Sequence, residues 1–294
     1  MVALGNLMTA MVTPFKDDMS VDYDKAEKLA MYLAENGSEA ILLHGTTGES
    51  PTLSHEEEYE LYRVVVKTLS GKCKVIAGTG SNSTLTSVKS TIEAEKIGVD
   101  GAMVVVPYYN KPSQEGLYQH FKAVAENTGL PLIIYNIPGR TGINMLPETV
   151  ARIADIKNYV GIKDAAGNLD QTSLTKKLCP SDFIIWSGDD SLTLPMMAVG
   201  AVGVISVASH IVGKDISAMV KAYQSGNVKK AQEIHLKLLP IFKVLFITAN
   251  PTPVKAALQM VGMPVGKPRL PLIEANDEEK DKIKKVLLEL DLIK

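Results

Sequence analysis

Short runs of apolar residues recur along the chain, and each run ends in small or polar residues. Runs of this length without strict polar–apolar alternation are typical of β-strands that other elements cover on both faces. We therefore expect strands at residues 7–12, 40–44, 75–78, 102–107, 131–135, 160–163, 183–187 and 202–207.

The segments between these runs carry apolar residues at helical spacing. Residues 56–69 show this most clearly, because Leu61 and Val65 lie one turn apart on the same face. Gly98 ends a second helix, expected over residues 84–97, and a third is expected over residues 115–126. Strands that alternate with helices in this way are typical of a parallel sheet with right-handed crossover connections.

Eight strand–helix units within roughly 200 residues favour a closed (β/α)8 barrel, the TIM barrel of the α/β class. An open, doubly wound parallel sheet is the alternative, because no contact that would close a barrel can be read from the sequence.

The alternating pattern stops after Val207, and only helices are expected beyond it. Residues 215–224 predict one helix, which Gly226 ends. Asn227 can cap a longer helix that reaches about residue 246.

Two more helices complete this C-terminal appendage. We expect Thr252 to cap one helix, with Pro253 at its first helical position. Asn276 caps a final amphipathic helix. The chain is thus expected to form a catalytic barrel over residues 1–225 and an all-helical domain over residues 226–294.

The composition is that of an ordinary globular protein: 294 residues, 46% hydrophobic and 22% charged, with a formal net charge of −2. A near-neutral chain without a stripe of basic residues argues against nucleic acid or an anionic membrane as partner. No apolar run approaches the roughly 20 residues of a membrane-spanning helix. The first six residues contain no basic region ahead of an apolar one, so no signal peptide is expected.

The cysteines and histidines predict where the protein is located and whether it binds a metal. Cys73 and Cys179 are the only cysteines, so we expect no disulfide framework and a reducing, cytoplasmic location. The five histidines form no close pair at the spacing of metal ligands, so no metal is expected; they are His44, His55, His120, His210 and His235.

Lys163 directly follows the apolar run Tyr159–Ile162 and precedes Asp164–Gly167, where we expect the chain to turn. Burial of an amine at a strand end lowers its pKa and favours the neutral, nucleophilic form. A neutral lysine can form a Schiff base with a carbonyl compound. Taken alone, Lys163 can also be explained as a side chain that extends past the sheet end into solvent.

Polar or glycine-rich segments follow several of the other expected strands. In a (β/α)8 barrel the active site lies at the carboxyl ends of the strands, so these segments should meet at one face. They are residues 45–49 (GTTGE), 78–82 (GTGSN), 108–110 (YYN), 135–140 (YNIPGR) and 188–190 (GDD).

Each of these segments also has a plain structural explanation. The loop Gly45–Gly48 can be a simple tight turn, although backbone amides of such loops also bind carboxylates or phosphates. Tyr135 can be a core residue, and Arg140 can be a solvated charge rather than a group that binds a substrate carboxylate. Asp189 and Asp190 are more typical of a helix cap than of a metal site.

Three segments, in this order, carry a family resemblance: Gly45–Ser50, Tyr135–Thr141 and Gly161–Asp164. They resemble the dihydrodipicolinate synthases, which belong to the pyruvate-dependent class I aldolase family that contains N-acetylneuraminate lyase. The resemblance runs essentially end to end, from residues 10–14 (AMVTP) to residues 250–255 (NPTPVK).

Arg140 and the pair Tyr108–Tyr109 indicate the synthase branch of this family. Without the resemblance, the two tyrosines would be taken for ordinary aromatic residues of a loop. The resemblance implies a carbon–oxygen lyase that condenses pyruvate with L-aspartate 4-semialdehyde to 4-hydroxy-tetrahydrodipicolinate, on the route to diaminopimelate and lysine. It implies no metal and no organic cofactor.

The resemblance also implies roles for single residues. Lys163 would form an imine with the keto group of pyruvate, and Tyr135 would be the general acid and base beside it. Thr47 would connect Tyr135 to Tyr109 in a proton relay. Arg140 would help to fix the relay and the carboxylate of the semialdehyde.

The remaining implied positions concern substrate binding and assembly. The backbone amides of Thr46 and Thr47 would hold the pyruvate carboxylate, and Gly188 and Ile205 would line the site. In the family the tyrosine that matches Tyr109 reaches the neighbouring subunit's site. A homo-oligomer is therefore implied, most often a tetramer built from two tight dimers.

Family members that lysine inhibits bind it at the dimer interface. Glu58 stands where these enzymes usually carry a histidine, and Thr86 stands where they carry a glutamate that faces the amino groups of lysine. We therefore expect weak or absent inhibition by lysine. The positions that match the lysine site are Ser50, Leu53, His55, Asn82 and Tyr108.

Three other functions remain open from the sequence. A sibling aldolase that acts on sialic acid or a 2-keto-3-deoxy sugar acid would share the lysine, the tyrosine and the threonine loop but would typically lack Arg140. A barrel lyase could use a metal bound by Asp189 and Asp190. A non-catalytic relative could merely bind keto acids, although binding alone does not need a nucleophile.

Overall fold

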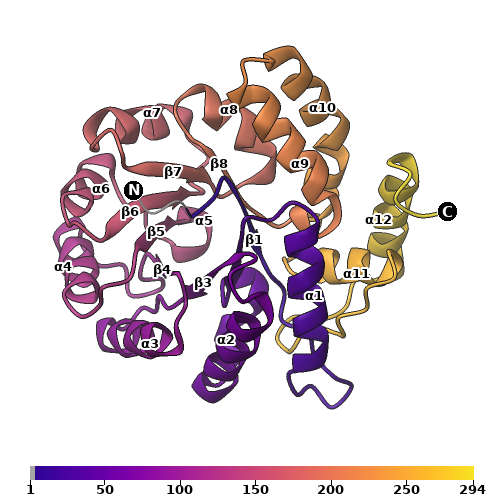
Figure 1. Ribbon diagram of the computed structural model, residues 1–294, viewed down its shortest axis with the longest axis horizontal. Coiled ribbons are helices and arrows are strands. Elements are labelled where there is room, and N and C mark those ends of the chain that lie inside the picture. Colours follow the sequence, from indigo (N-terminus) through magenta and orange to yellow (C-terminus); the bar gives the residue numbers. More distant parts are fainter. Residues whose placement is uncertain (1–3) are drawn as a thin grey trace. The chain divides into compact units, whose positions relative to one another are not determined.

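The computed structural model describes residues 4–294; residues 1–3, on which the expectation of no signal peptide partly depends, lie outside the described part. The strands are parallel and form one closed barrel, in which they follow one another in chain order (Figure 1). This confirms the barrel over the open sheet. The strands are β1 (Leu7–Ala10), β2 (Ala40–Leu43), β3 (Lys74–Gly78), β4 (Gly101–Val105), β5 (Leu132–Asn136), β6 (Tyr159–Asp164), β7 (Ile184–Ser187) and β8 (Gly203–Ser206).

Helices connect these strands, and four further helices follow β8. Each expected strand is present, with ends that differ from the expectation by one or two residues. The connecting helices are α1 (Tyr23–Glu35), α2 (His55–Leu69), α3 (Thr84–Ile97), α4 (Gln114–Ala125), α5 (Pro138–Thr141), α6 (Pro147–Ala154), α7 (Leu169–Leu178) and α8 (Thr193–Ala198). The later helices are α9 (Ser209–Gln224), α10 (Val228–Val244), α11 (Thr252–Met260) and α12 (Asp277–Glu289).

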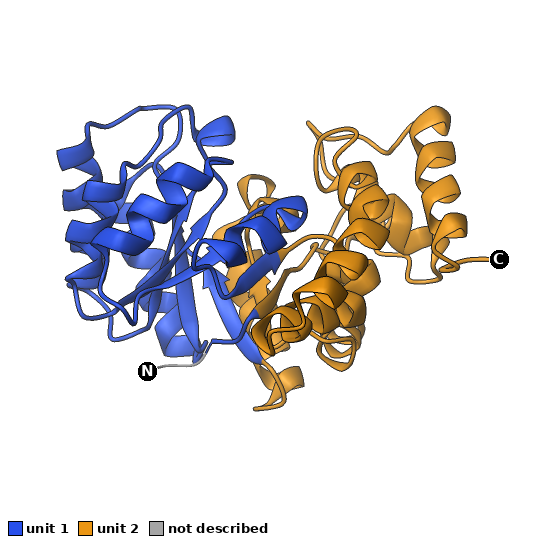
Figure 2. Cartoon of the chain, turned by 90° about the horizontal axis from the view of Figure 1, so that it is seen from above, with its two compact units in different colours: residues 1–6, 74–205 blue, residues 7–73, 206–294 orange. Residues whose placement is uncertain are grey.

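The chain packs into two compact units (Figure 2). Among the described residues, the first unit contains residues 4–6 and 74–205, and the second contains residues 7–73 and 206–294. The sequence pattern predicts a different division, into a catalytic barrel over residues 1–225 and a helical domain over residues 226–294. That division stays a prediction. None of the helices within residues 4–294 has the length and apolar character needed to cross a membrane.

Strand β6 lies between β5 and β7 in the first unit. Its register determines which residues of these two strands lie beside Lys163. Lys163 is paired in register with Tyr135 on β5 and with Trp186 on β7. The strands can approach this closely because residue 161 is glycine. A Cβ atom at Gly161 would lie 2.3 Å from the carbonyl oxygen of Ile184 and 2.6 Å from the ring of Trp186.

Strand β6 continues one residue beyond Lys163, so the expectation that Lys163 ends the strand is wrong. Asp164 still pairs in register with Asn136 of β5, and it is buried. Its carboxylate accepts hydrogen bonds from the Ala166 amide at 3.0 Å and from the Thr172 hydroxyl at 2.8 Å. These bonds satisfy the carboxylate inside the fold, which allows the strand to extend past the lysine.

The second unit contains β1 and β2 as a parallel pair, with α1 packed against α2 and α9 packed against α10. Helix α11 contacts both α9 and α12. Helix α2 confirms the helix expected over residues 56–69; Leu61 and Val65 are buried on its inner face, together with Tyr62 and Leu69. This unit therefore contains the threonine loop after β2 and the whole C-terminal segment.

Two of the three expected C-terminal caps are confirmed. The side chain of Asn227 accepts a hydrogen bond from the Lys230 amide at the start of α10. Asn276 caps α12 and forms a reciprocal capping box with Glu279. Both asparagines thus satisfy amide groups that the first turn of a helix leaves without a partner.

The third expected cap is wrong. Thr252 is the first residue of α11, and the capping position is Pro251, which forms no side-chain capping bond. The Thr252 hydroxyl instead donates to the carbonyl oxygen of Ile273 at 2.8 Å. A tertiary hydrogen bond has therefore taken the side chain that the local pattern assigned to the helix start.

Candidate active site

Lys163 is buried next to Tyr135 in the first unit. Lys163 is 5% exposed. The Nζ atom of Lys163 lies 4.4 Å from the centroid of the Tyr135 ring. Burial lowers the pKa of Lys163 to about 8, while the nearby carboxylate of Asp190 opposes this shift and the charge of Arg140 adds to it. An appreciable fraction of the amine is therefore neutral near physiological pH, as a Schiff-base nucleophile requires.

Asp190 is a functional candidate that the sequence pattern does not separate from Asp189. Asp190 is 3% exposed and begins the 3-10 turn η3 (Asp190–Leu192). Asp189 is the cap of that turn, because its carboxylate accepts hydrogen bonds from the Ser191 amide and hydroxyl, both at 2.8 Å. The capping role expected here is thus confirmed for Asp189, whereas Asp190 is the carboxylate that acts on Lys163.

Arg140 lies in the short helix α5, directly after β5, and it is exposed. Within residues 4–294 no carboxylate forms an ion pair with its guanidinium group. The charge of Arg140 lowers the pKa of Lys163. Arg140 is therefore available for an anionic ligand near the lysine.

Amide side chains, of which Asn136 is buried, hold the loop that carries Arg140. Asn136, at the end of β5, donates to Asn144 at 2.9 Å and accepts from the Met145 amide at 3.1 Å. Asn144 in turn donates to Gln171 of α7 at 2.7 Å. Sequence reasoning missed these residues; the only signal was that Asn136 follows Tyr135 at the polar end of a strand.

Tyr109 has an unusual backbone and an exposed side chain. Its φ angle is 74°, in the left-handed region, and the residue is 87% exposed. The Tyr109 amide donates to the carbonyl oxygen of Thr141 at 3.3 Å, and the preceding Tyr108 is 37% exposed. A left-handed φ angle raises the conformational free energy of a residue other than glycine. Such strained residues cluster at functional sites, so Tyr109 is a candidate for a functional role.

The threonine loop in the second unit is a 3-10 turn, η1 (Thr46–Gly48), directly after β2. The amides of Gly48 and Glu49 donate to the carbonyl oxygens of Gly45 and Thr46. In contrast, the amides of Thr46 and Thr47 form no hydrogen bond with the part of the chain that the structure describes. Two adjacent amides without an acceptor are suited to bind a carboxylate.

Two contacts hold this loop from other parts of the second unit. The Thr13 hydroxyl donates to the carbonyl oxygen of Gly48 at 2.6 Å. The Nδ2 atom of Asn250 donates to the Thr47 hydroxyl oxygen at 2.9 Å, and both side chains are buried. Asn250 is a further residue whose role sequence reasoning missed, because no local pattern connects it with Thr47.

A buried ion pair anchors the end of the loop. Glu49 is 2% exposed and has a left-handed φ of 57°. One of its carboxylate oxygens lies 2.5 Å from Nζ of Lys255, and the other accepts from the Arg269 amide at 2.8 Å. The Lys255 Nζ atom also lies 4.3 Å from the centroid of the Phe15 ring. Burial lowers the pKa of Lys255, and the carboxylate of Glu49 opposes that shift.

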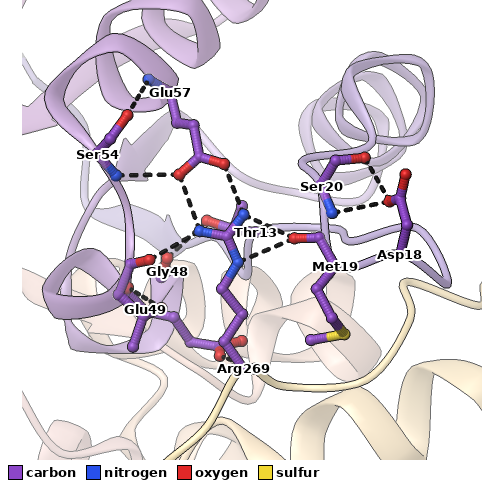
Figure 3. Close-up of polar contacts among 10 residues, drawn as sticks. Thr13, Asp18, Met19, Ser20, Gly48, Glu49, Ser54, Glu57 and Arg269 are labelled. Carbon is purple, nitrogen blue, oxygen red and sulfur yellow. Dashed lines mark hydrogen bonds and ion pairs between the residues drawn. The ribbon is translucent and has the colours of Figure 1, made fainter.

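The guanidinium group of Arg269 connects the same region to α2 (Figure 3). It donates two hydrogen bonds to the carboxylate of Glu57, at 2.5 and 2.8 Å. It also donates to the carbonyl oxygens of Met19 and Thr52. The bidentate bond to Arg269 lowers the pKa of Glu57. The threonine loop is thus held by charged groups of the C-terminal segment.

Gly188 and Ile205, the two expected lining positions, both lie in the first unit. A Cβ atom at Gly188 would lie 2.6 Å from Cβ of Ala165, so glycine is required by this close approach. The Gly188 amide donates to the carbonyl oxygen of Asp164 at 2.7 Å. Ile205 is 1% exposed within β8. Both positions are tightly packed.

Three residues of the expected lysine site lie in the second unit, and two of them contact Glu58. The Nδ1 atom of His55 lies 2.8 Å from Oε2 of Glu58, and the Ser50 hydroxyl donates to Oε1 at 3.4 Å. Burial raises the pKa of Glu58, and His55 opposes this rise. Leu53, the third residue, is half-buried. The carboxylate of Glu58 is thus already engaged within the chain.

The other two expected lysine-site residues, Asn82 and Tyr108, lie in the first unit. The carbonyl oxygen of Asn82 accepts a hydrogen bond from Asn110 at 2.9 Å. Thr86 stands where the resemblance implies a glutamate in the lysine-inhibited enzymes. It lies in the first turn of α3, and its amide donates to the hydroxyl of Ser83. Over residues 4–294 there is no group of three or more His, Cys, Asp or Glu side chains placed to hold a metal ion.

Comparisons with known proteins agree with the resemblance that the motifs carry. The sequence model of the Dihydrodipicolinate synthetase family matches residues 3–290. The chain is 56% identical over 293 residues to the 4-hydroxy-tetrahydrodipicolinate synthase of Desulforamulus reducens, and the match covers 99% of each chain.

Solved structures give the same result. A dihydrodipicolinate synthase from Bacillus anthracis is 50% identical with a TM-score of 0.96, over 98% of this chain and 99% of that one. The corresponding enzyme from Cyanidioschyzon merolae, solved with lysine bound, is 47% identical with a TM-score of 0.97, over 99% of both chains.

Proposed function

Because the chain belongs to the Dihydrodipicolinate synthetase family, we infer that it is a carbon–oxygen lyase, a 4-hydroxy-tetrahydrodipicolinate synthase in activity. It condenses pyruvate with L-aspartate 4-semialdehyde, in the pathway to diaminopimelate and lysine. The observation that carries this function is the buried amine of Lys163 beside the phenol ring of Tyr135.

Lys163 is the proposed nucleophile. Its neutral amine attacks the keto carbon of pyruvate, and loss of water leaves a cationic imine. The positive charge acidifies the methyl group, which loses a proton to give an enamine. The enamine carbon then attacks the aldehyde carbon of the semialdehyde. Finally, the amino group of that substrate attacks the imine carbon, which closes the ring and releases Lys163.

Tyr135 is the proposed general acid and base for these steps, because it lies on the neighbouring strand in register with Lys163. Thr47 and Tyr109 complete the proposed proton relay between the site and the surface. Thr47 follows β2 and Tyr109 follows β4, and in a parallel barrel the segments after the strands form the catalytic face.

The carboxylates of the two substrates need separate partners. We assign the pyruvate carboxylate to the amides of Thr46 and Thr47, which have no acceptor within the described chain. We assign the semialdehyde carboxylate to Arg140, whose planar guanidinium group can form two parallel hydrogen bonds with it. Gly188 and Ile205 line the site in this proposal.

The exposure of Tyr109 supports a homo-oligomer. A relay tyrosine that is 87% exposed on one chain gains a defined position when a second subunit covers it. We propose a tight dimer in which Tyr109 reaches the neighbouring subunit's site, and a tetramer built from two such dimers. We also propose a cytoplasmic enzyme, in line with Cys73 and Cys179, which are both buried and not joined in a disulfide.

Inhibition by lysine is proposed to be weak or absent. Glu58 is engaged by His55 and Ser50, so it offers little to a bound ammonium group. Thr86 lacks the carboxylate that would pair with that group.

One assay tests the proposed function directly. Purified enzyme is given pyruvate with L-aspartate 4-semialdehyde and, separately, pyruvate with N-acetylmannosamine. We expect ring product from the semialdehyde only. Turnover of N-acetylmannosamine at a higher kcat/KM would instead identify a sialic acid lyase.

A further inference from the structure

Asn250 is a buried amide side chain for which the proposed mechanism has no role. It lies two residues before α11 and is 5% exposed. Its Nδ2 atom donates to the Thr47 hydroxyl oxygen at 2.9 Å, across 203 positions of the chain. Its Oδ1 atom has no hydrogen-bond partner within residues 4–294. The side-chain amide is therefore committed to Thr47.

We propose that Asn250 is a positioning residue that sets the direction in which the Thr47 hydroxyl donates its proton. The proposal rests on the proposed role of Thr47 as a member of the proton relay. Asn250 does not touch the reacting atoms in this proposal; it acts through Thr47 alone.

The hydrogen-bond inventory of a hydroxyl group gives the reason. A threonine hydroxyl has one hydrogen to donate and two lone pairs to accept with. The N–H group of Asn250 occupies one lone pair, so the Thr47 hydrogen cannot point toward Asn250. One hydrogen and one lone pair remain. A relay member needs one of each, because it must receive a proton on one side and release one on the other.

The surrounding contacts keep this geometry rigid. Lys255, in the same C-terminal segment as Asn250, pairs with Glu49, which follows the threonine turn. Thr13 holds the carbonyl oxygen of Gly48. The loop is therefore fixed at Thr47 and at the two residues that follow it, and the C-terminal segment contributes two of the three contacts.

Two substitutions test the direction of the hydroxyl. In Asn250→Asp the carboxylate can only accept, so it takes the Thr47 hydrogen and leaves the relay without a donor. We expect kcat for the ring product to fall about 100-fold, the lower end of the roughly 10²-fold to 10⁴-fold that proton transfer by a positioned group contributes. In Asn250→Ala the hydroxyl is free to rotate, and we expect a smaller loss of about 3-fold to 10-fold. Asn227→Asp is the matched control, since Asn227 is an exposed helix cap and the charge change is the same.

Three readouts separate this role from a merely structural one. The first is the final extent of imine formation with pyruvate, trapped by borohydride, which should change less than about 2-fold because the relay affects only the rate of imine formation and Lys163 is untouched. The second is the melting temperature. The third is the effect of each Asn250 change in a Thr47→Val background, where it should disappear because no hydroxyl remains to be directed.

These measurements accept or reject the positioning role of Asn250. The proposal is overturned if the loss in kcat persists at full size in the Thr47→Val background, or if the final extent of imine formation falls in parallel with kcat. If Asn250→Asp does not fold, the cycle of Asn250→Ala with Thr47→Val gives the same decision. A wild-type enzyme that forms no imine and no ring product refutes the proposed function instead, independently of Asn250.

Discussion

The Nζ atom of Lys163 lies 4.4 Å from the centroid of the Tyr135 ring, and the two residues are in register on neighbouring strands. Both are 5% exposed. The strand register thus holds an amine with a lowered pKa against a phenol ring, with no flexible loop between them. A site built on strands is more precise than one built on loops, which suits a reaction with several proton-transfer steps.

Reduction with borohydride in the presence of pyruvate should leave a stable adduct on Lys163 and inactivate the enzyme. The chain offers a stringent internal control. Lys255 is also buried with a lowered pKa, but the carboxylate of Glu49 holds it in an ion pair. Mass spectrometry of a digest should therefore find the adduct on Lys163 and none on Lys255. Fully inactivated protein with an unmodified Lys163 peptide would refute the Schiff-base mechanism.

Adduct formation should depend on pH through Lys163. Its pKa is lowered to about 8, so the neutral, reactive amine grows as pH rises and half of it is present near pH 8. The initial trapping rate should rise through this range and then level off. Asp190→Asn removes the anion that favours the charged amine, so its curve should move to lower pH. Arg140→Ala removes a repelling cation, so its curve should move to higher pH; shifts in the reverse directions would contradict the assignment.

Arg140→Ala should lower kcat/KM for the semialdehyde far more than it slows imine formation with pyruvate. Loss of a charged hydrogen bond is worth about 1.5–3 kcal/mol, or roughly 10-fold to 150-fold in kcat/KM. Arg140→Lys keeps the charge without the planar pair of donors, so we expect an intermediate loss. Steady-state kinetics with each substrate varied in turn measure the effect. Equal losses for both substrates would indicate that Arg140 only holds the loop.

The Glu49–Lys255 pair should be strongly coupled in stability. Lys255→Met leaves the buried carboxylate of Glu49 without a countercharge, which should lower the free energy of unfolding by about 3–5 kcal/mol. Adding Glu49→Gln should recover part of that loss, because the unpaired charge is removed as well. Lys282→Ala, which breaks an exposed pair with Glu278, is the control and should leave the denaturation midpoint unchanged. Additive effects of the two buried changes would show that the pair is not coupled.

Lysine should inhibit the wild-type enzyme weakly or not at all, and two substitutions should strengthen the inhibition. Glu58→His restores the usual residue and removes the contact with His55 at 2.8 Å. Thr86→Glu supplies a carboxylate for the amino groups of lysine. Steady-state assays over a lysine titration compare wild type, the single variants and the double variant. Saturable sub-millimolar inhibition of the wild type would show that the remaining pocket residues suffice.

The elements of the barrel could be predicted because their signals are local. The apolar runs marked every strand, and the helix expected over residues 84–97 has those bounds in the structure. The position of Lys163 near a strand end was equally readable, since a charged residue interrupts an apolar run there. The burial and the lowered pKa of Lys163, expected from that position, are confirmed.

Local signals failed where a side chain had a choice of partners. Thr252 fits the pattern of a helix cap, yet its hydroxyl bonds to the carbonyl oxygen of Ile273. Asp189 and Asp190 look alike in the sequence, but only Asp190 acts on the charge of Lys163. The composition of a segment lists the hydrogen bonds that are possible, whereas the packing of distant segments selects among them.

The sequence by itself therefore determined the strands, several of the helices and the buried position of Lys163, because periodicity, burial cost and turn chemistry act over a few residues. Only the tertiary structure decided what holds the threonine loop. Asn250 reaches Thr47 across 203 positions, and Arg269 reaches Glu49 across 220. Contacts at such separations depend on how the whole chain closes on itself, and a buried polar group takes whichever partner that closure brings within hydrogen-bond distance.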